Sequence, residues 1–500
     1  MPPVLTVCQS MLTFAAFCPA PSSLLSTQTH SDFYGFPSNP ISIYRTGPVW
    51  PQPAGPQAQR VPREARPVCV HPIASVWYEL GREIYEYFDS IELRWTSINP
   101  VRFAEAGKEP GPLYLWVGVM PGHDVELAFR ESVFTRSVGP QLLSHIPSVN
   151  ATADVRATIA PKAYSHFEGT GCLYLREGGE HDRVLLLTAR HVVLPPSEYG
   201  NDAYARKTTS APRRDKVLEA TMSKIGHDAF MVAHYKRELE GLAEVEGEEE
   251  EITDARKEYT HNLARAEKAI RALTEFHSKT TRFWSIEGQR IIGHVHHAPQ
   301  ISVGTGEKCY TEDWAVVELH SEKFNNWEGF KGNVMYLGNK ISAADFAFKM
   351  HPRPESRATF KYPLGGLMQL KDIVKESELR NPTMRDANGE PCLPVVKNGN
   401  TTLGRATGIE SFVREYLDYG IRTTSMGIAI YPYSYRDGAF SAPGDSGSVI
   451  ADANGRIVGI LTGGSGQTDS TDVTYATPYY WVDARVKTVF PNAYLFPIAA

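Results

Sequence analysis

The sequence predicts a mainly β protein that carries an inserted pair of antiparallel helices and an N-terminal extension. From residue 159 onward, short runs of β-branched residues are separated by clusters of Gly, Pro and Asn, as is typical of strands and turns. Between 215 and 278 the apolar spacing changes from two residues to about 3.5, which is the coiled-coil period of paired helices. Residues 1–70 contain twelve prolines and almost no acidic residues.

The composition is that of an ordinary globular chain with a sizeable core. The 500 residues are 42% hydrophobic and 22% charged, with a formal net charge of −6. This length suggests several domains at roughly 150 residues each. The small negative charge argues against a nucleic-acid or anionic membrane partner, and no apolar run reaches the ~18 residues that a membrane-spanning helix needs.

Six scattered cysteines indicate neither a disulfide framework nor a metal-binding motif. The first twenty residues contain an apolar stretch, but they lack a basic n-region, and Gln9 and Ser10 interrupt the apolar part. We therefore expect an intracellular, cytoplasmic location, with a weak N-terminal signal as the alternative.

The N-terminal part is expected to hold two segments. Residues 1–70 are predicted to be a disordered Pro-rich tail, because they cannot bury enough apolar surface to offset their ordering entropy. Residues 72–150 are predicted to be a small α+β unit, with helical apolar spacing over 77–88 and a buried strand over 113–119.

Residues 215–278 are predicted to form an antiparallel helical hairpin. Each arm carries an apolar stripe, and Gly247 followed by the run Glu248–Glu251 separates the two arms. The acidic run is interpreted as a solvated turn with N-terminal helix charge, and a docking site for a basic partner is the alternative. The stripes are Leu218, Met222, Ile225, Ala229, Val232 and Leu239, and then Ile252, Tyr259, Leu263, Ala266, Ile270 and Leu273.

The other expected elements are strands, beginning with a hairpin whose turn is Gly178-Gly179. Further strands are expected over 290–296, 313–319, 427–431, 448–450 and 456–461.

Three short strings stand out because of their order. Residues 187–192 place His191 at the end of an apolar strand, residues 312–317 place Asp313 just ahead of another, and residues 442–448 place Ser446 in a glycine-flanked turn. Each alone is common in structural turns and strand ends. The three together suit nucleophilic catalysis, in which His191 takes the proton of Ser446 and Asp313 orients the imidazole.

The glycines around Ser446 serve the same chemistry. They allow a sharp turn in which the N–H groups of Gly444 and Ser446 converge on a developing oxyanion. Such a donor typically contributes about 10²–10³ in rate.

These strings resemble the His, Asp and Ser motifs of chymotrypsin/trypsin-like serine peptidases of the PA clan, including microbial and fungal members. The resemblance implies a chymotrypsin-like double β-barrel, and it covers about half of the chain. Supporting similarities are Gly169-Thr170-Gly171 before the His strand, the run 396–402 at the start of a second barrel, and 473–477 after the substrate-binding strand. In that strand, Thr462, Gly463 and Gly464 are implied to bind substrate backbone.

The resemblance also implies the domain limits. A first barrel is expected over 155–325 with the hairpin 215–278 inserted, a connector over 326–394, and a second barrel over 395–490. The connector is expected to cover part of the cleft.

The chain departs from the family pattern in three ways. The cysteines that secreted members carry beside the His and Ser motifs are absent, which agrees with a reducing compartment. No activation terminus precedes Gly169, so Asp445 has no evident new N-terminus to pair with. Phe440 stands at the position implied to be the floor of the specificity pocket, which argues against Lys or Arg and for a small or apolar residue before the cut.

No cofactor and no metal are expected. His294, His296 and His297 are close in sequence, but no acidic or Cys ligand lies near them along the chain, so we interpret them as residues of a strand edge.

The sequence thus predicts a serine endopeptidase that acts on polypeptides. One alternative is a latent or inactive binding module that uses the helical hairpin to dock a protein partner, because a fold does not guarantee an activity. An esterase or acyl transferase with the same triad is the other alternative, which peptide against ester turnover would distinguish.

Overall fold

The computed structural model describes most of the chain from residue 32 onward. The described residues are 32–42, 50, 61–120, 129–136, 158–164, 167–201, 208–210, 215–243, 250–284, 287–327, 330–337, 341–398, 402–416, 422–466 and 470–496. The signal-like segment 1–20, Glu248 and residues 399–401 of the second-barrel motif lie outside them. None of the described helices is long and apolar enough to cross a membrane.

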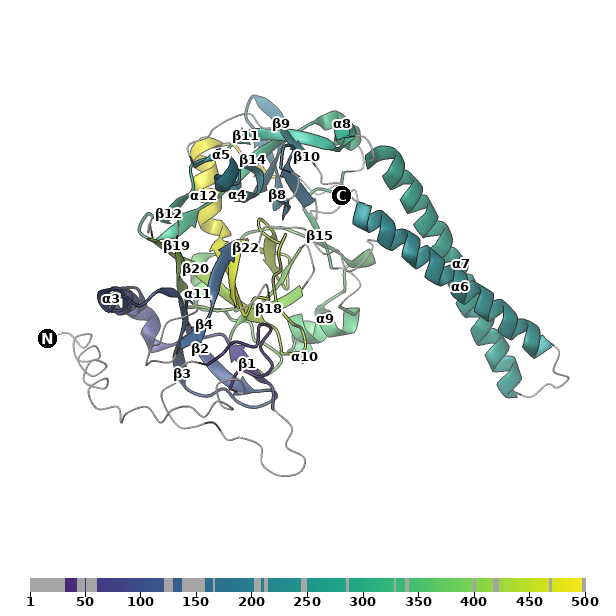
Figure 1. The fold of residues 1–500 in the computed structure, drawn as a ribbon, viewed down its shortest axis with the longest axis horizontal. Coiled ribbons are helices and arrows are strands. Elements are labelled where there is room, and N and C mark those ends of the chain that lie inside the picture. The colour runs from purple at the N-terminus through teal and green to yellow at the C-terminus, as the bar shows by residue number, and fades with distance from the viewer. Residues whose placement is uncertain are drawn as a thin grey trace.

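The C-terminal half contains a closed six-stranded barrel, seen near the centre of Figure 1. Antiparallel pairs connect neighbouring strands around it, and pairing of its first strand with its last closes it. Alternate side chains therefore fill an enclosed apolar core. In spatial order the strands are β18 (Thr402–Ala406), β17 (Leu393–Lys397), β21 (Val449–Asp452), β22 (Ile457–Gly466), β23 (Val473–Pro478) and β20 (Arg422–Pro432).

A second, eight-stranded antiparallel sheet packs against this barrel, and one apolar cluster continues through both. Together with the helical insertion, this arrangement confirms the predicted mainly β fold class. In order the strands are β24 (Tyr494–Leu495), β8 (Leu173–Gly178), β9 (His181–Thr188), β14 (Ala315–Leu319), β11 (Ile291–His297), β10 (Thr208–Ser210), β6 (Thr158–Pro161) and β7 (Gly169–Thr170).

The predicted separate unit 72–150 is instead an extension of the barrel sheet. Strand β2 (Trp95–Glu105) pairs with β3 (Leu113–Val119) on one side and with β19 (Ser411–Tyr416) on the other, and β19 continues into β20. Helix α3 (Trp77–Ser90) lies on this extension, where a Cβ on Gly81 would be 2.1 Å from the Phe412 ring. The unit therefore shares backbone hydrogen bonds with the barrel sheet, and its apolar cluster is completed by Phe412 and Met426 of that sheet.

Part of the predicted disordered tail is also ordered. Strand β1 (Arg63–Arg66) pairs with β2, and Phe33 and Phe36 are buried against Phe103 and Trp116. The proline count did not reveal this, because a few aromatic residues are enough to anchor the segment to a preformed sheet. Two further strands follow β3, namely β4 (Phe129–Glu131) and β5 (Val133–Arg136).

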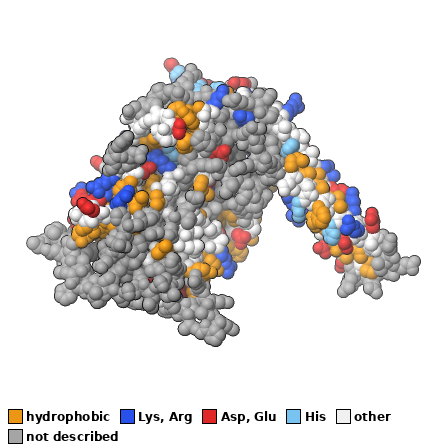
Figure 2. All heavy atoms as spheres, in the orientation of Figure 1, with side chains coloured by type: hydrophobic (Ala, Val, Ile, Leu, Met, Phe, Trp, Pro, Cys, Tyr) orange, Lys and Arg blue, Asp and Glu red, His pale blue; other side chains and the backbone are white. Residues whose placement is uncertain are grey.

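The helical hairpin consists of α6 (Asp215–Ala243) and α7 (Glu250–Trp284), inserted between β10 and β11, as predicted. The two helices lie side by side and extend away from the β body (Figure 1). Lys236 Nζ of α6 lies 3.4 Å from Glu267 Oε1 of α7. Hydrophobic side chains reach its surface (Figure 2); Met222 is 52% exposed and Phe230 is 70% exposed.

The predicted connector 326–394 folds against both sheets. Its hairpin pairs β15 (Val334–Tyr336) with β16 (Leu367–Gln369), and Phe346 and Met350 of α9 (Ala343–Met350) are buried in the shared core. The remaining elements are α4 (Arg190–Val193), α5 (Pro196–Tyr199), α8 (Glu287–Arg290), α10 (Pro354–Thr359), α11 (Glu376–Arg380), α12 (Tyr479–Val489), β12 (Ser302–Thr305), β13 (Tyr310–Glu312) and short 3-10 turns at 72–75, 321–327 and 364–366.

Candidate active site

His191 and Asp313 are brought together by strand pairing. His191 follows β9 on the single turn α4, Asp313 precedes β14, and the two strands pair so that Ala315 lies opposite Thr188. The His191 Nδ1 atom is 2.5 Å from Asp313 Oδ2, and the His191 backbone N–H donates to Asp313 Oδ1 at 3.0 Å. The carboxylate therefore holds both the ring and the backbone of the histidine.

The turn that carries Ser446 docks onto this same region of the eight-stranded sheet. The Thr170 backbone N–H donates to the Ser446 carbonyl at 2.8 Å, and Thr170 Oγ1 donates to the Gly444 carbonyl at 2.9 Å. Gly447 has φ +83°, and a Cβ there would lie 2.4 Å from the Thr170 carbonyl oxygen and 2.6 Å from Thr188 Oγ1. Glycine is thus required for the turn to reach the strand end that precedes His191.

The serine is not hydrogen-bonded to the histidine in this structure. Ser446 Oγ donates to the Thr462 carbonyl at 3.3 Å, and His191 Nε2 is buried with no hydrogen-bond partner among the described residues. Within the same residues, the Ser446 N–H has no acceptor. Two of the three predicted residues are joined, and Ser446 lies in the turn packed against the strand end that precedes His191, with its hydroxyl directed to the Thr462 carbonyl.

Asp445 has a cationic partner that the sequence did not reveal. Lys397 Nζ lies 2.8 Å from Asp445 Oδ2, and both side chains are buried. The same carboxylate oxygen accepts the Ala442 N–H at 2.8 Å. In place of the new N-terminus considered from the sequence, a lysine of β17 pairs with Asp445 and ties the serine turn to the barrel wall.

Arg136 is the second site residue that sequence reasoning missed. Its Nη1 donates to Asp313 Oδ2 at 2.8 Å, and its Nε and Nη2 donate to the two carboxylate oxygens of Glu415 at 3.0 Å each. These partners are 177 and 279 residues away in the chain, so no local motif links them.

The charges around Asp313 keep it ionised. Burial acts to raise the pKa of Asp313, but the nearby His191 and Arg136 outweigh it and hold that pKa below its usual value. Burial acts to lower the pKa of Arg136, and the carboxylates of Asp313 and Glu415 reverse this, so that the pKa of Arg136 is raised. Both groups are therefore charged throughout the physiological pH range.

The lowered pKa of Asp313 predicts a loss of stability in acid. Because this pKa is lower in the folded than in the unfolded chain, the stabilisation is complete above the ordinary Asp pKa of about 3.9 and is lost as the pH falls through the folded value. Urea unfolding between pH 2 and pH 6 should show a free energy of unfolding that decreases towards acid. The slope should be smaller in Asp313→Asn by up to about 1.4 kcal/mol per pH unit, and equal slopes in the two chains would contradict the prediction.

The residues predicted to bind substrate are divided by the structure. Thr462, Gly463 and Gly464 lie on β22. Of these, Thr462 accepts the Ser446 hydroxyl and lines a small pocket. Phe440 is 1% exposed, packs against Gly404 in the barrel core and does not line that pocket. A pocket floor at this position stays a prediction. The pocket is lined by Phe134, Arg136, Val303, Thr311, Asp313, Val413, Glu415, Thr423, Ser425, Met426, Gly427, Thr462, Tyr475, Ala476 and Thr477.

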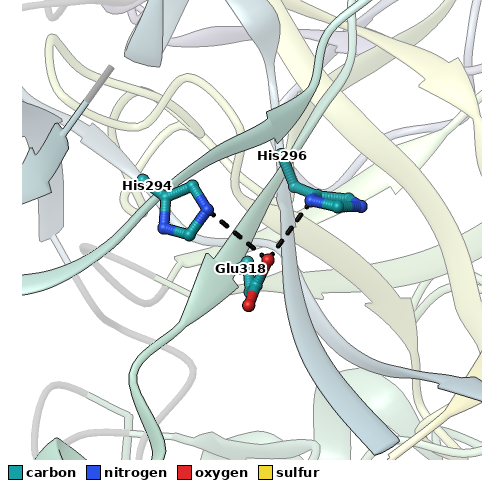
Figure 3. Close-up of side chains that lie close together, drawn as sticks. All are labelled: His294, His296 and Glu318. Atoms are coloured by element: carbon teal, nitrogen blue, oxygen red, sulfur yellow. Dashed lines mark ion pairs between the residues drawn. The ribbon is translucent and has the colours of Figure 1, made fainter. Parts of the chain in front are cut away.

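Two of the clustered histidines do have an acidic neighbour. Glu318 of β14 lies opposite His294 of β11, and its Oε2 is 3.4 Å from His294 Nε2 and 3.3 Å from His296 Nδ1 (Figure 3). One ligand atom from each lies within 4.8 Å of the others, and two imidazoles with a carboxylate are a donor set that zinc accepts. Glu318 was not predictable from the sequence, because strand pairing and not chain proximity brings it there.

No protein-family model matches the chain, and comparison with curated proteins finds no match. Among solved structures, the chain is similar to a glutamic acid specific serine protease described as using a histidine triad in substrate binding. The identity is 10%, the TM-score is 0.30, and the match covers 68% of this chain and 98% of that one. It is also similar to the Rv3671c protease of M. tuberculosis in its active form, with 12% identity, a TM-score of 0.27, and coverage of 73% of this chain and 94% of that one. These TM-scores are too low to assign an activity or a substrate to this chain.

Proposed function

We propose that this protein is a serine endopeptidase that cleaves polypeptides through an acyl-enzyme on Ser446. The observation that carries the proposal is the hydrogen-bonded pair of His191 and Asp313, with the glycine-flanked turn of Ser446 packed against the strand end beside it. An aspartate bonded to Nδ1 leaves Nε2 as the free base, which is the arrangement that serine activation needs.

The proposed reaction begins when the Ser446 hydroxyl turns from the Thr462 carbonyl to His191 Nε2. Oγ then attacks the peptide carbonyl carbon, and its proton passes to Nε2. Asp313 stabilises the imidazolium through Nδ1–H, and the N–H groups of Gly444 and Ser446 stabilise the oxyanion. His191 next gives the proton to the leaving amine, and a water molecule hydrolyses the ester in the same way.

Covalent labelling with a fluorophosphonate probe tests the nucleophile, with the modified residue located by peptide mass mapping. We expect label on Ser446 in the folded chain and loss of label in His191→Ala, because the hydroxyl is inert without its base. The Arg136→Ala chain is labelled in parallel, because Arg136 binds the same Asp313 carboxylate that orients His191. Equal labelling with and without His191, or no Ser446 label in the wild type and in Arg136→Ala, would overturn the proposal.

A further inference from the structure

Strand β22 has an edge that begins at the proposed nucleophile. Strand β23 pairs with one edge of β22 from Gly459 to Ser465, and β21 pairs with the other edge only as far as Ile460. Beyond that point the second edge passes Thr462, whose carbonyl accepts the Ser446 hydroxyl, and continues to Gly466. A strand edge that the neighbouring barrel strand leaves open can bind an extended peptide through backbone hydrogen bonds.

In this structure, β5 of the same chain fills that edge. It runs antiparallel to β22, with Arg136 opposite Gly463 and Val133 opposite Gly466. The C-terminal end of β5 therefore points towards Ser446. Arg136 lies one residue before the position that would face Thr462.

One of the two predicted glycines, Gly463, explains why β5 fits so closely here. A Cβ on Gly463 would lie 2.5 Å from the Thr135 carbonyl oxygen and 2.7 Å from the Phe134 ring. The Phe134 ring also packs against Tyr475, with the centroids 5.9 Å apart. Any side chain at position 463 would push β5 away from the edge.

The Arg136 guanidinium is held by two carboxylates at the end of this groove. Glu415 binds it with two parallel hydrogen bonds, and Asp313 binds Nη1, while the arginine side chain stays 20% exposed. Both acids also line the pocket that opens beside Thr462. This fork geometry matches arginine and is poorly met by lysine, whose ammonium is a point charge.

We propose that β5 occupies the place of the substrate, and that Glu415 and Asp313 form a subsite for an arginine side chain of the peptide that displaces it. The inference rests on the proposed peptidase function and adds to it a substrate class and a form of regulation. In the preferred peptide, arginine is the residue on the N-terminal side of the one that faces Thr462. The proposed peptidase activity is inhibited until β5 leaves the edge of β22.

Loosening β5 tests the regulatory part. We compare kcat/KM of the full-length chain with Arg136→Ala and Phe134→Ser, using the fluorogenic peptide acetyl-Phe-Thr-Arg-Ala-aminocoumarin. Both changes should raise kcat/KM about tenfold or more, because competition from β5 is weakened. Phe134→Ser leaves the charged groups around Asp313 unchanged, so it tests the role of β5 even where Arg136→Ala fails to fold. Arg422→Ala is the matched control, since this exposed arginine pairs only weakly with Asp89 at 3.5 Å, and it should not change the rate.

Changing the arginine of the peptide tests the subsite. In the Phe134→Ser chain, the peptide with Arg should be cleaved about 30-fold better than the same peptide with Gln, as expected for a charged bidentate contact. Glu415→Gln should reduce this preference to about threefold. Calorimetry measures binding without turnover, using acetyl-Phe-Thr-Arg-amide and the chain with Ser446→Ala and Phe134→Ser. Adding Glu415→Gln to this chain should weaken binding of the peptide about tenfold.

The two proposals fail in different ways. If fluorophosphonate labels Ser446 but neither β5 variant raises the rate and no preference for arginine is seen, the inference is overturned and the peptidase function stands. If the peptide binds in a Glu415-dependent manner but Ser446 is never labelled, the subsite stands and the peptidase function falls.

Discussion

Ser446→Ala should lower kcat by about 10⁴–10⁶ and leave the melting temperature within about 2 °C of the wild type. Activity is lost because no other group can form the acyl-enzyme. Stability is kept because the described contacts of the hydroxyl amount to one long hydrogen bond, to the Thr462 carbonyl at 3.3 Å. Hydrolysis of an arginine-containing peptide in the Phe134→Ser background and a thermal melt of each chain provide the two measurements.

A matched control lies two residues further along the same turn. Ser448 is also buried, and its hydroxyl has no partner among the described residues. Ser448→Ala should therefore leave both the rate and the melting temperature nearly unchanged. Turnover of Ser446→Ala within about tenfold of the parent would show that the nucleophile is another group.

Lys397→Met should destabilise the barrel by about 3–5 kcal/mol, because it leaves the Asp445 carboxylate buried without its cation. The melting temperature should fall by roughly 10 °C. The rate of fluorophosphonate labelling at Ser446 should fall as well, since Asp445 also accepts the Ala442 N–H and thereby shapes the serine turn. In the proposed reaction Lys397 is a positioning residue, because it reaches Ser446 only through Asp445.

The double variant Lys397→Met with Asp445→Asn separates charge from shape. An amide is uncharged, so its burial without a cation costs little, and its oxygen can still accept the Ala442 N–H. Most of the lost stability should therefore return. Labelling should recover in parallel if the turn is restored. A single Lys397→Met variant that melts at the wild-type temperature would show that the buried pair does not support this turn.

Several local features were predictable from short stretches of sequence. The strand over 113–119 has the predicted bounds, and the turn at Gly178-Gly179 occurs where expected, with φ +73° and +65°. Both depend on neighbours in the chain, namely a continuous apolar run and two residues that tolerate positive φ. The helical hairpin was predictable for the same reason, although α7 continues to Trp284 instead of ending near 278.

Other predictions failed because they treated neighbours in sequence as neighbours in space. The extension over 72–150 was assigned as a unit of its own, yet β2 pairs with β19 from the far end of the chain. The histidines of β11 were judged to lack an acidic ligand, yet strand pairing places Glu318 beside them.

The sequence by itself determined the mainly β class and the inserted helices, and it predicted the candidate site residues His191, Asp313 and Ser446, because each depends on a local pattern of apolar spacing or turn glycines. Tertiary structure alone decided what surrounds them. Lys397 neutralises Asp445, and Arg136 reaches Asp313 from a strand 177 residues away. Buried charges need partners wherever the fold can supply them, and only the folded backbone brings such distant groups within a few ångströms.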